Sequence, residues 1–198
     1  LAVYHGTTPR GVYEHHRLTL QTQLMDDDCY LPFRRRPIPA LTQSAELIAA
    51  GEDAENLRNG YDRPIGAADN GWTGHPGDSV TYRLAEPAVV KKARLIFDSD
   101  LNRLTLPEDP QYNRPQRANY FLDDKPMRVP ATLIRDFRLD VCPENGHWYA
   151  FQTVNGNHQR LVTLDLSPAG PVAAVRFVPL ATWGSPDCHV FSFDLSDC

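Results

Sequence analysis

The hydrophobic pattern of the chain changes near residue 79. From there onward, short segments rich in β-branched and aromatic residues follow one another, several of them alternating apolar and polar positions as a half-buried strand does. Seven such segments occur, at residues 79–84, 93–97, 137–142, 148–154, 160–166, 172–178 and 189–195. Turn residues separate most of them, including two Asn-Gly pairs. The pattern therefore predicts a mostly β protein, an antiparallel β-sandwich or jelly roll.

Before residue 79, the sequence pattern predicts little regular secondary structure. Apolar residues recur at helical spacing over residues 9–25, and a second short helical stretch is predicted over residues 53–58. We expect residues 1–39 to form a partly helical extension that packs on a sandwich made by residues 40–198. A proline-rich stretch at residues 104–129 predicts a long ordered loop between two strands, and such loops are usually functional.

Charge and composition exclude several classes of partner. The chain has 198 residues with 20 Lys+Arg against 25 Asp+Glu, a net charge of −5. This balance argues against nucleic-acid binding, which needs a dense basic face. No apolar stretch approaches the roughly 20 residues of a membrane span. Four widely spaced cysteines, Cys29, Cys142, Cys188 and Cys198, form no CxxC zinc or redox motif, and they allow two disulfides in three connectivities. The cysteines are compatible with either an oxidising or a reducing compartment.

Enzyme signatures are absent from the sequence. It contains no G-x-S-x-G, no P-loop, no H-E-x-x-H and no G-x-G-x-x-G motif. A hydrolase would rest on scattered acidic residues alone. We therefore expect no catalytic activity and no cofactor in this chain by itself.

Candidate ligand-binding residues lie in the predicted loops. Aromatic rings stack on the C–H face of a sugar, while carboxylate, amide and guanidinium groups pair with its hydroxyls. Six residues combine these properties near one predicted edge: Asp62, Arg63, Asn70, Trp72, Arg160 and Trp183. Arg160 offers a planar set of donors for vicinal hydroxyls or a carboxylate. The alternative is that both tryptophans are buried and that the Asp–Arg pair only braces a loop.

Two other features allow more than one interpretation. Asp98 and Asp100 follow a predicted strand, where they could bind a structural calcium ion or a polyol, or merely end the strand. Trp148 alternates with core positions, so we expect it in the core rather than on a ligand-binding surface.

The order of several segments resembles a known fold. Residues 69–72, the strand ending at residue 84, and residues 90–100, 176–187 and 190–195 look like the galactose-binding-like sandwich of discoidin and coagulation-factor type C modules. Residues 24–32, 57–64, 97–103 and 129–134 also resemble, in the same order, the C-terminal region of bacterial FAD-dependent oxidoreductases. The second resemblance covers most of residues 18–198.

This resemblance implies a ligand-recognition module, carbohydrate-binding, attached to a flavin domain that would precede Leu1 in a parent chain. The FAD fingerprint is absent here, so FAD binding carries over to no residue of this sequence. The competing interpretation is a structural domain that docks on the flavin domain or mediates oligomerisation without binding sugar. A shared fold does not decide between these functions.

Overall fold

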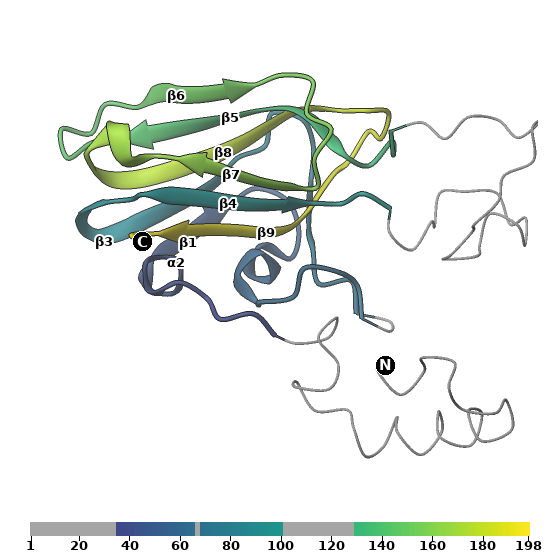
Figure 1. The fold of residues 1–198 in the computed structure, drawn as a ribbon, viewed down its shortest axis with the longest axis horizontal. Helices are drawn as coiled ribbons and strands as arrows, with labels where there is room; N and C mark the ends of the chain where they lie inside the picture. The colour runs from purple at the N-terminus through teal and green to yellow at the C-terminus, as the bar shows by residue number, and fades with distance from the viewer. Residues whose placement is uncertain (1–34, 66–67, 101–128) are drawn as a thin grey trace, which may run out of the picture. The chain divides into compact units, whose positions relative to one another are not determined.

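The computed structural model describes residues 35–65, 68–100 and 129–198. The chain divides between Pro37 and Ile38, and Ile38–Cys198 form one compact unit built on two antiparallel β-sheets (Figure 1). The predicted helix over residues 9–25 lies outside the described residues, as does almost all of the predicted loop over residues 104–129. The N-terminal extension therefore stays a prediction.

All seven predicted strands are present, together with two that the sequence pattern did not predict. The short helical stretch predicted at residues 53–58 is a 3-10 helix. The elements of the described unit are α2 (Ala40–Ser44), β1 (Glu46–Ala49), η3 (Ala54–Arg58), β2 (Trp72–Gly74), β3 (Val80–Val89), β4 (Lys92–Phe97), β5 (Ile134–Cys142), β6 (Tyr149–Val154), β7 (Leu161–Asp165), η4 (Ser167–Ala169), β8 (Pro171–Thr182) and β9 (Cys188–Ser196). Among the described helices, none is long and apolar enough to cross a membrane.

The strands form two layers, which confirms the predicted sandwich. One sheet has the order β1-β3-β8-β5-β6 and the other the order β2-β9-β4-β7. Every strand pair is antiparallel, and β9, the last strand in sequence, lies between β2 and β4. In Figure 1 the two sheets face each other, with β4 and β9 in the layer below β5 and β6.

Aromatic rings from both sheets fill the space between the layers. Phe97 of β4 contacts Phe137 of β5 with ring centroids 5.2 Å apart, and Phe177 of β8 contacts Phe193 of β9 at 5.8 Å. Tyr82 of β3 completes the group against Phe193 at 5.1 Å. All five rings are fully buried. Rings of this size bury large apolar areas, so these contacts hold the two sheets together.

One end of the sandwich gathers loops from distant parts of the sequence. At the right-hand end of Figure 1, β4 ends at Phe97 and β9 begins at Cys188. The edge strand β2 pairs with the start of β9, where Trp72 lies opposite Val190. The segment that leads into β5 also reaches this end, because Trp183 after β8 donates its backbone N–H to the carbonyl of Leu133. Side chains from four loops can therefore meet there.

Candidate functional site

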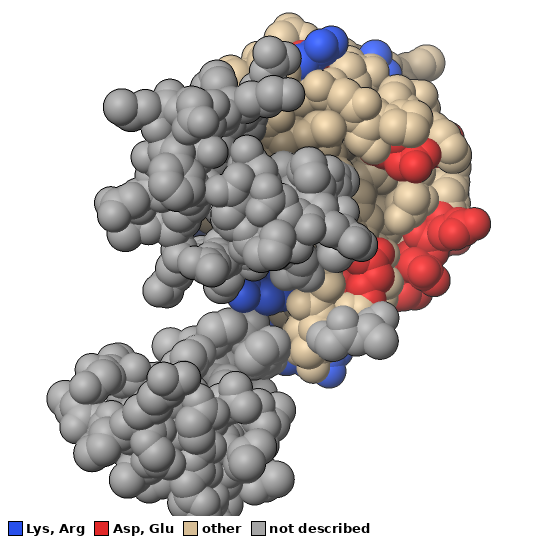
Figure 2. Space-filling view, turned by 90° about the vertical axis from the view of Figure 1, so that its right-hand side faces the viewer, with Lys and Arg blue, Asp and Glu red and all other residues tan. Residues whose placement is uncertain are grey.

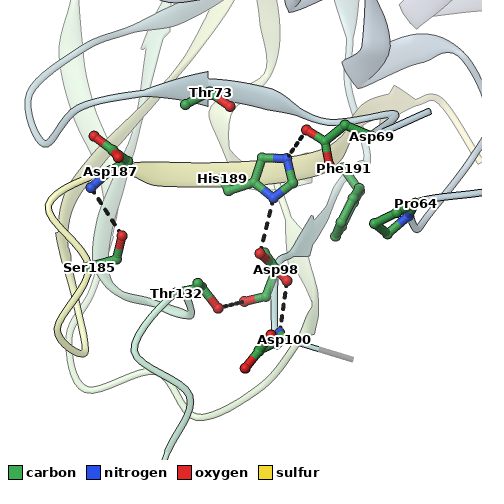
Figure 3. Close-up of a pocket in the computed structure, with 10 residues that line it drawn as sticks. All are labelled: Pro64, Asp69, Thr73, Asp98, Asp100, Thr132, Ser185, Asp187, His189 and Phe191. Carbon is green, nitrogen blue, oxygen red and sulfur yellow. Dashed lines mark hydrogen bonds and ion pairs between the residues drawn. The ribbon is translucent and has the colours of Figure 1, made fainter. Parts of the chain in front are cut away.

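A pocket of about 300 Å³ opens at this loop-bearing end. Its walls come from the loop before β2, from β2 itself, from the segments after β4 and before β5, and from the β8–β9 turn and the start of β9. The lining residues are Pro64, Asp69, Thr73, Asp98, Asp100, Thr132, Ser185, Asp187, His189 and Phe191 (Figure 3). These residues span well over 100 positions of sequence, so the pocket exists only in the folded sandwich.

His189 lies at the centre of the pocket between two carboxylates (Figure 3). Its Nδ1 is 3.1 Å from Oδ2 of Asp98, and its Nε2 is 2.9 Å from Oδ2 of Asp69. The side chains of His189 and Asp98 are 15% and 20% exposed, whereas that of Asp69 is 59% exposed. The imidazole therefore connects a partly buried acid at the end of β4 to an open acid on the loop before β2.

The two carboxylates favour the charged form of His189. Burial lowers the pKa of this imidazole, but the hydrogen bond to Asp98 and the charges of Asp69 and Asp98 together raise it above its usual value. Burial likewise raises the pKa of Asp98, and the hydrogen bonds from His189 and from the backbone N–H of Asp100 outweigh it, so that pKa is lowered. With both ring nitrogens facing carboxylates, the imidazolium donates from each.

Close packing fixes the orientation of the His189 ring. A Cβ atom at residue 71 would lie 2.0 Å from Nε2 of His189, so the absence of a side chain at Gly71 is what makes room for the imidazole. On another side, the ring meets Phe191 edge-on, with centroids 4.7 Å apart. These neighbours hold the imidazole in one orientation within the pocket.

Two short turns supply the other carboxylates of the pocket. The backbone N–H of Asp100 donates to Oδ1 of Asp98 at 2.8 Å, and Asp100 adopts a left-handed φ of 52°, which aspartate tolerates better than most residues. In the β8–β9 turn the backbone N–H of Asp187 donates to Oγ of Ser185 at 3.1 Å. His75 approaches Asp187, with Nε2 3.4 Å from Oδ1.

Four of the six candidate ligand residues lie together, next to the pocket rather than in its lining. A terminal nitrogen of Arg160 donates to the backbone carbonyl of Asp62, and Nδ2 of Asn70 donates to the carbonyl of Arg63 at 3.2 Å. The Asp62 carboxylate accepts from Arg94 at 2.8 Å. These contacts join the loop around residue 62 to the sheet, which is the bracing that the alternative interpretation describes. A direct role of these residues toward a ligand stays a prediction.

Trp72 does not present an aromatic face to solvent. The side chain is fully buried, and its Nε1 donates to the carbonyl of Ala50 at 2.8 Å. Cβ atoms at residues 51 and 74 would fall 2.9 Å and 2.3 Å from the indole, so two glycines allow the backbone to approach it closely. The expectation that this ring stacks on a ligand is wrong, because its position in β2 points it into the core.

The other two tryptophans also differ from simple expectation. Trp183 is partly buried, donates from Nε1 to the carbonyl of Asn157 at 2.7 Å, and stacks on His158 with centroids 4.7 Å apart. It does not line the pocket. Trp148, which the alternation placed in the core, is 38% exposed and lies under the guanidinium of Arg176 at 4.3 Å. It immediately precedes β6 and faces outward.

The metal candidates Asp98 and Asp100 both line the pocket. Within residues 35–65, 68–100 and 129–198, no group of three or more His, Cys, Asp or Glu side chains is arranged to hold a metal ion. Asp98 instead contacts His189. A calcium site involving these residues stays a prediction. Cys142, Cys188 and Cys198 are free thiols, so no disulfide joins any two of these three.

Sequence reasoning missed the residue at the centre of the site. The sequence pattern places His189 in the strand over residues 189–195 and indicates no function for it. Within that strand it is one of the polar residues, and it closely follows the turn that contains Pro186 and Asp187. A histidine on the polar side of a strand's alternation, close in space to acidic residues of two neighbouring loops, is a usable signal. It becomes informative only when the strand order is known, because Asp69 and Asp98 are far away in sequence.

The pocket can accept hydrogen bonds in many directions. Four carboxylates supply acceptors, and Thr73, Thr132 and Ser185 supply hydroxyl groups that donate or accept. Pro64 and Phe191 add apolar surface. Figure 2, which faces this end of the molecule, shows Asp and Glu side chains gathered on one part of the described surface. Such a site suits a small ligand with several hydroxyl groups.

Comparisons with known proteins identify the fold. No protein-family model matches the sequence, and no curated protein is significantly similar to it. Solved structures do match. A family 32 carbohydrate-binding module from Streptococcus pneumoniae EndoD aligns with a TM-score of 0.53 and 17% identity over 81% of this chain and 98% of its own.

Two further structures agree. A Clostridium perfringens protein solved in complex with GalNAc-β-1,3-galactose aligns with a TM-score of 0.51 and 12% identity over 79% of this chain and 97% of its own. A fucose-binding module from Streptococcus pneumoniae aligns with a TM-score of 0.52 and 11% identity over 80% of this chain and 97% of its own. At such identities the likeness establishes the fold alone: this chain has the same β-sandwich fold as these modules.

Proposed function

We propose that this chain is a carbohydrate-binding module that takes a sugar in the pocket around His189 and does not alter it chemically. The observation that carries the proposal is the imidazole held between Asp98 and Asp69 at the loop-bearing end of the sandwich. Three solved structures of the same fold are a carbohydrate-binding module, a protein in complex with GalNAc-β-1,3-galactose, and a fucose-binding module. Both the shared fold and the polar lining of the pocket therefore support sugar binding.

The geometry supports recognition rather than catalysis. His189 is already engaged on both ring nitrogens, so its role is to present fixed carboxylates and an imidazolium to hydroxyl groups. Preformed polar groups lose little freedom when a ligand binds, so little of the binding free energy is spent on ordering the site. The neighbouring loop with Asp62, Arg63, Asn70 and Arg160 would then form an adjacent wall, which remains part of the proposal.

A glycan array followed by titration calorimetry tests the proposal. We expect the wild-type chain to bind a subset of glycans, and a His189→Gln variant to lose at least about tenfold in affinity, since the imidazolium is lost and two carboxylates lose the partner that orients them. His147→Gln is the matched control, because His147 is exposed in the β5–β6 turn at the other end of the sandwich. Unfolding curves establish that each variant is folded.

Two outcomes would reject the proposal. One is a folded wild-type chain that binds no glycan on the array, which would favour the structural or docking function. The other is binding that His147→Gln and His189→Gln weaken equally, or not at all, which would place the site elsewhere.

The link to a flavin enzyme rests on sequence resemblance alone, and the structural neighbours above lend it no support. It stays a separate proposal about a parent chain. We expect the purified chain to be colourless. A stoichiometric flavin absorbance spectrum would contradict that expectation.

A further inference from the structure

The two sheets of the sandwich end in four edge strands, β1 and β6 in one sheet and β2 and β7 in the other. Three of them carry a feature that hinders further pairing. β1 has only four residues and begins at Glu46, whose carboxylate pairs with Arg83 at 2.9 Å. The backbone of Thr73 in β2 is already hydrogen-bonded to that of Glu52. The register between β6 and β5 shifts at one point, which marks a bulge. Short strands, charges, covering segments and bulges all keep an edge from pairing with another chain.

The fourth edge strand, β7, is regular and open. Its register with β4 has no shift between residues 161 and 165, and no described residue pairs with its outer edge. The N–H of Phe97 donates to the carbonyl of Arg160 just before the strand, so the backbone groups of the even-numbered residues face β4. The N–H and C=O groups of Leu161, Thr163 and Asp165 therefore point away from the sheet.

Charge does not oppose contact at this edge. Leu161 is 50% exposed, and Thr163 is also exposed and uncharged. The one acid of the strand, Asp165, lies opposite Lys92 of β4, so its charge is balanced within the same sheet. A chain with a net charge of −5 repels its own copies least where its surface is locally neutral.

We propose that β7 pairs antiparallel with β7 of a second copy of this chain, which joins two four-stranded sheets into one. A two-fold axis through the middle of the strand places Thr163 opposite its own counterpart and Leu161 opposite Asp165 of the second copy. In this register the outward N–H and C=O groups of all three residues find partners. Isologous pairing of this kind is the commonest symmetry of homodimers.

The side chains of β7 match a second copy on both faces of the strand. On the outer face, two threonines meet at the axis, which is a favourable cross-strand pair, and the acid of each copy faces a leucine rather than the other acid. On the core face, the same register sets Val162 beside Leu164 of the second copy. Both are already 8% exposed or less in one chain, so pairing continues the apolar core across the axis. The complementarity is therefore to β7 itself.

The pairing also sets the direction of the two pockets. β7 begins at the loop-bearing end, because Arg160 before it is hydrogen-bonded to Phe97 at the end of β4. Antiparallel strands run in opposite directions, so the pockets of the two copies open at opposite ends of the dimer. This consequence rests on the proposed function: such a dimer links two separate glycans instead of holding one glycan at two points.

Analytical ultracentrifugation between about 1 and 100 µM tests the pairing. We expect the wild-type chain to dimerise in this range, and Thr163→Lys to raise the dissociation constant at least about tenfold, because two ammonium groups then face each other at the axis. Ile48→Lys is the matched control, because it places the same charge on an exposed position of β1, an edge strand of the other sheet. The control should keep the wild-type dissociation constant, and melting curves establish that each variant is folded.

Mixing two variants tests the register. Thr163→Lys and Thr163→Glu should each be mainly monomeric alone, since like charges meet at the axis. We expect an equimolar mixture of the two to form the dimer again, because opposite charges then face each other. Dimers in the mixture would also demonstrate that neither variant has lost its fold.

Two outcomes overturn the inference. One is a wild-type chain that stays monomeric up to about 100 µM, which would leave the edge of β7 open to a strand of a different protein. The other is a dimer that Thr163→Lys does not weaken or that the mixture does not restore, because the contact would then lie elsewhere. Glycan affinity is measured separately. Thr163 is not part of the pocket lining, so Thr163→Lys should bind sugar as wild type does, and a failure of sugar binding rejects the proposed function without affecting the dimer.

Discussion

Two charged triplets in this molecule mirror each other. In the pocket, one cation, His189, lies between Asp98 and Asp69. On the outer face of the five-stranded sheet, one anion, Asp140, lies between Arg138 at 2.5 Å and Arg176 at 2.7 Å.

The triplets differ in what holds them. Asp140 and Arg176 are directly opposite each other in the β5–β8 pairing, and Arg138 is two residues away on the same face. Strand register therefore fixes all three, and Asp140 is only 1% exposed. In the pocket, a strand residue meets two residues outside the strands, and Asp69 is open to solvent. The comparison suggests that the strand triplet stabilises the fold and the loop triplet binds ligand.

The largest effect should follow from removing the strand anion. We expect Asp140→Asn to lower the free energy of unfolding by about 3 kcal/mol, because two guanidinium groups lose their shared charge partner. Sugar affinity should remain within about twofold of wild type. Urea unfolding and calorimetry measure the two quantities. A loss of affinity greater than the loss explained by unfolded protein would show that the two triplets are coupled.

The pocket cation should have the opposite profile. We expect His189→Gln to cost about 1–2 kcal/mol of stability, since one carboxylamide can replace part of the hydrogen bonding, while ligand affinity falls at least about tenfold. The same two measurements apply. Should stability drop as far as in Asp140→Asn with affinity preserved, the loop triplet would be structural and the contrast would disappear.

Adding a methyl group at residue 71 disturbs the loop triplet around His189 without removing any of its charges. We expect Gly71→Ala to displace the His189 ring, lengthen its contact with Asp69, and reduce ligand affinity about threefold to tenfold, at a stability cost of about 1 kcal/mol. Gly146→Ala is not a clean comparison, because its φ is 78°. Ala150→Gly on β6 is a better control for a change of one methyl group, and its effect should be confined to stability.

The smallest effect is a dependence of stability on pH. His189 has a pKa raised above 6.5, so its contribution is complete below pH 6.5 and is lost as the pH rises through the folded-state pKa. Asp98 has a pKa lowered below 3.8, so its contribution is complete above pH 3.8 and is lost as the pH falls through the folded-state value. Both contributions are therefore complete between these limits.

Unfolding free energies measured from about pH 5 to pH 9 should show this loss on the alkaline side in wild type and a flatter profile in His189→Gln. Parallel profiles for the two proteins would mean that another group titrates, and that the pair with Asp98 adds nothing to stability.

The sequence predicted most of the sandwich because its inner strands follow the physical pattern closely. Tyr82 and Leu84 of β3, for example, alternate with the polar residues Thr81 and Arg83, and both apolar side chains are buried. The two missed strands lack that signal: β1 has four residues at a sheet edge, and β2 has three, two of them glycine or threonine. Short edge strands owe their conformation to a partner, which local pattern cannot reveal.

The candidate site was predictable in part for a related reason. Asp98 and Asp100 could be singled out because acids at the end of a strand reach the surface at the edge of a sheet. The prediction for Trp72 is wrong because the neighbouring Asp69, Asn70 and Gly71 indicate a loop, whereas Trp72 is the first residue of β2, a strand that the pattern does not predict. His189 needed the pairing of β9 with both β2 and β4, which depends on tertiary contacts more than 90 residues apart in sequence.

The central position of β9 also governs how the molecule acquires its native form. This strand is the last of the sandwich to leave a ribosome, yet β2 and β4 are joined in their sheet only through it. Contacts between such distant segments slow refolding, and all-β domains with this character typically fold in about milliseconds to seconds. We expect half of the sandwich, and with it the ability to bind, to appear in one late step rather than gradually.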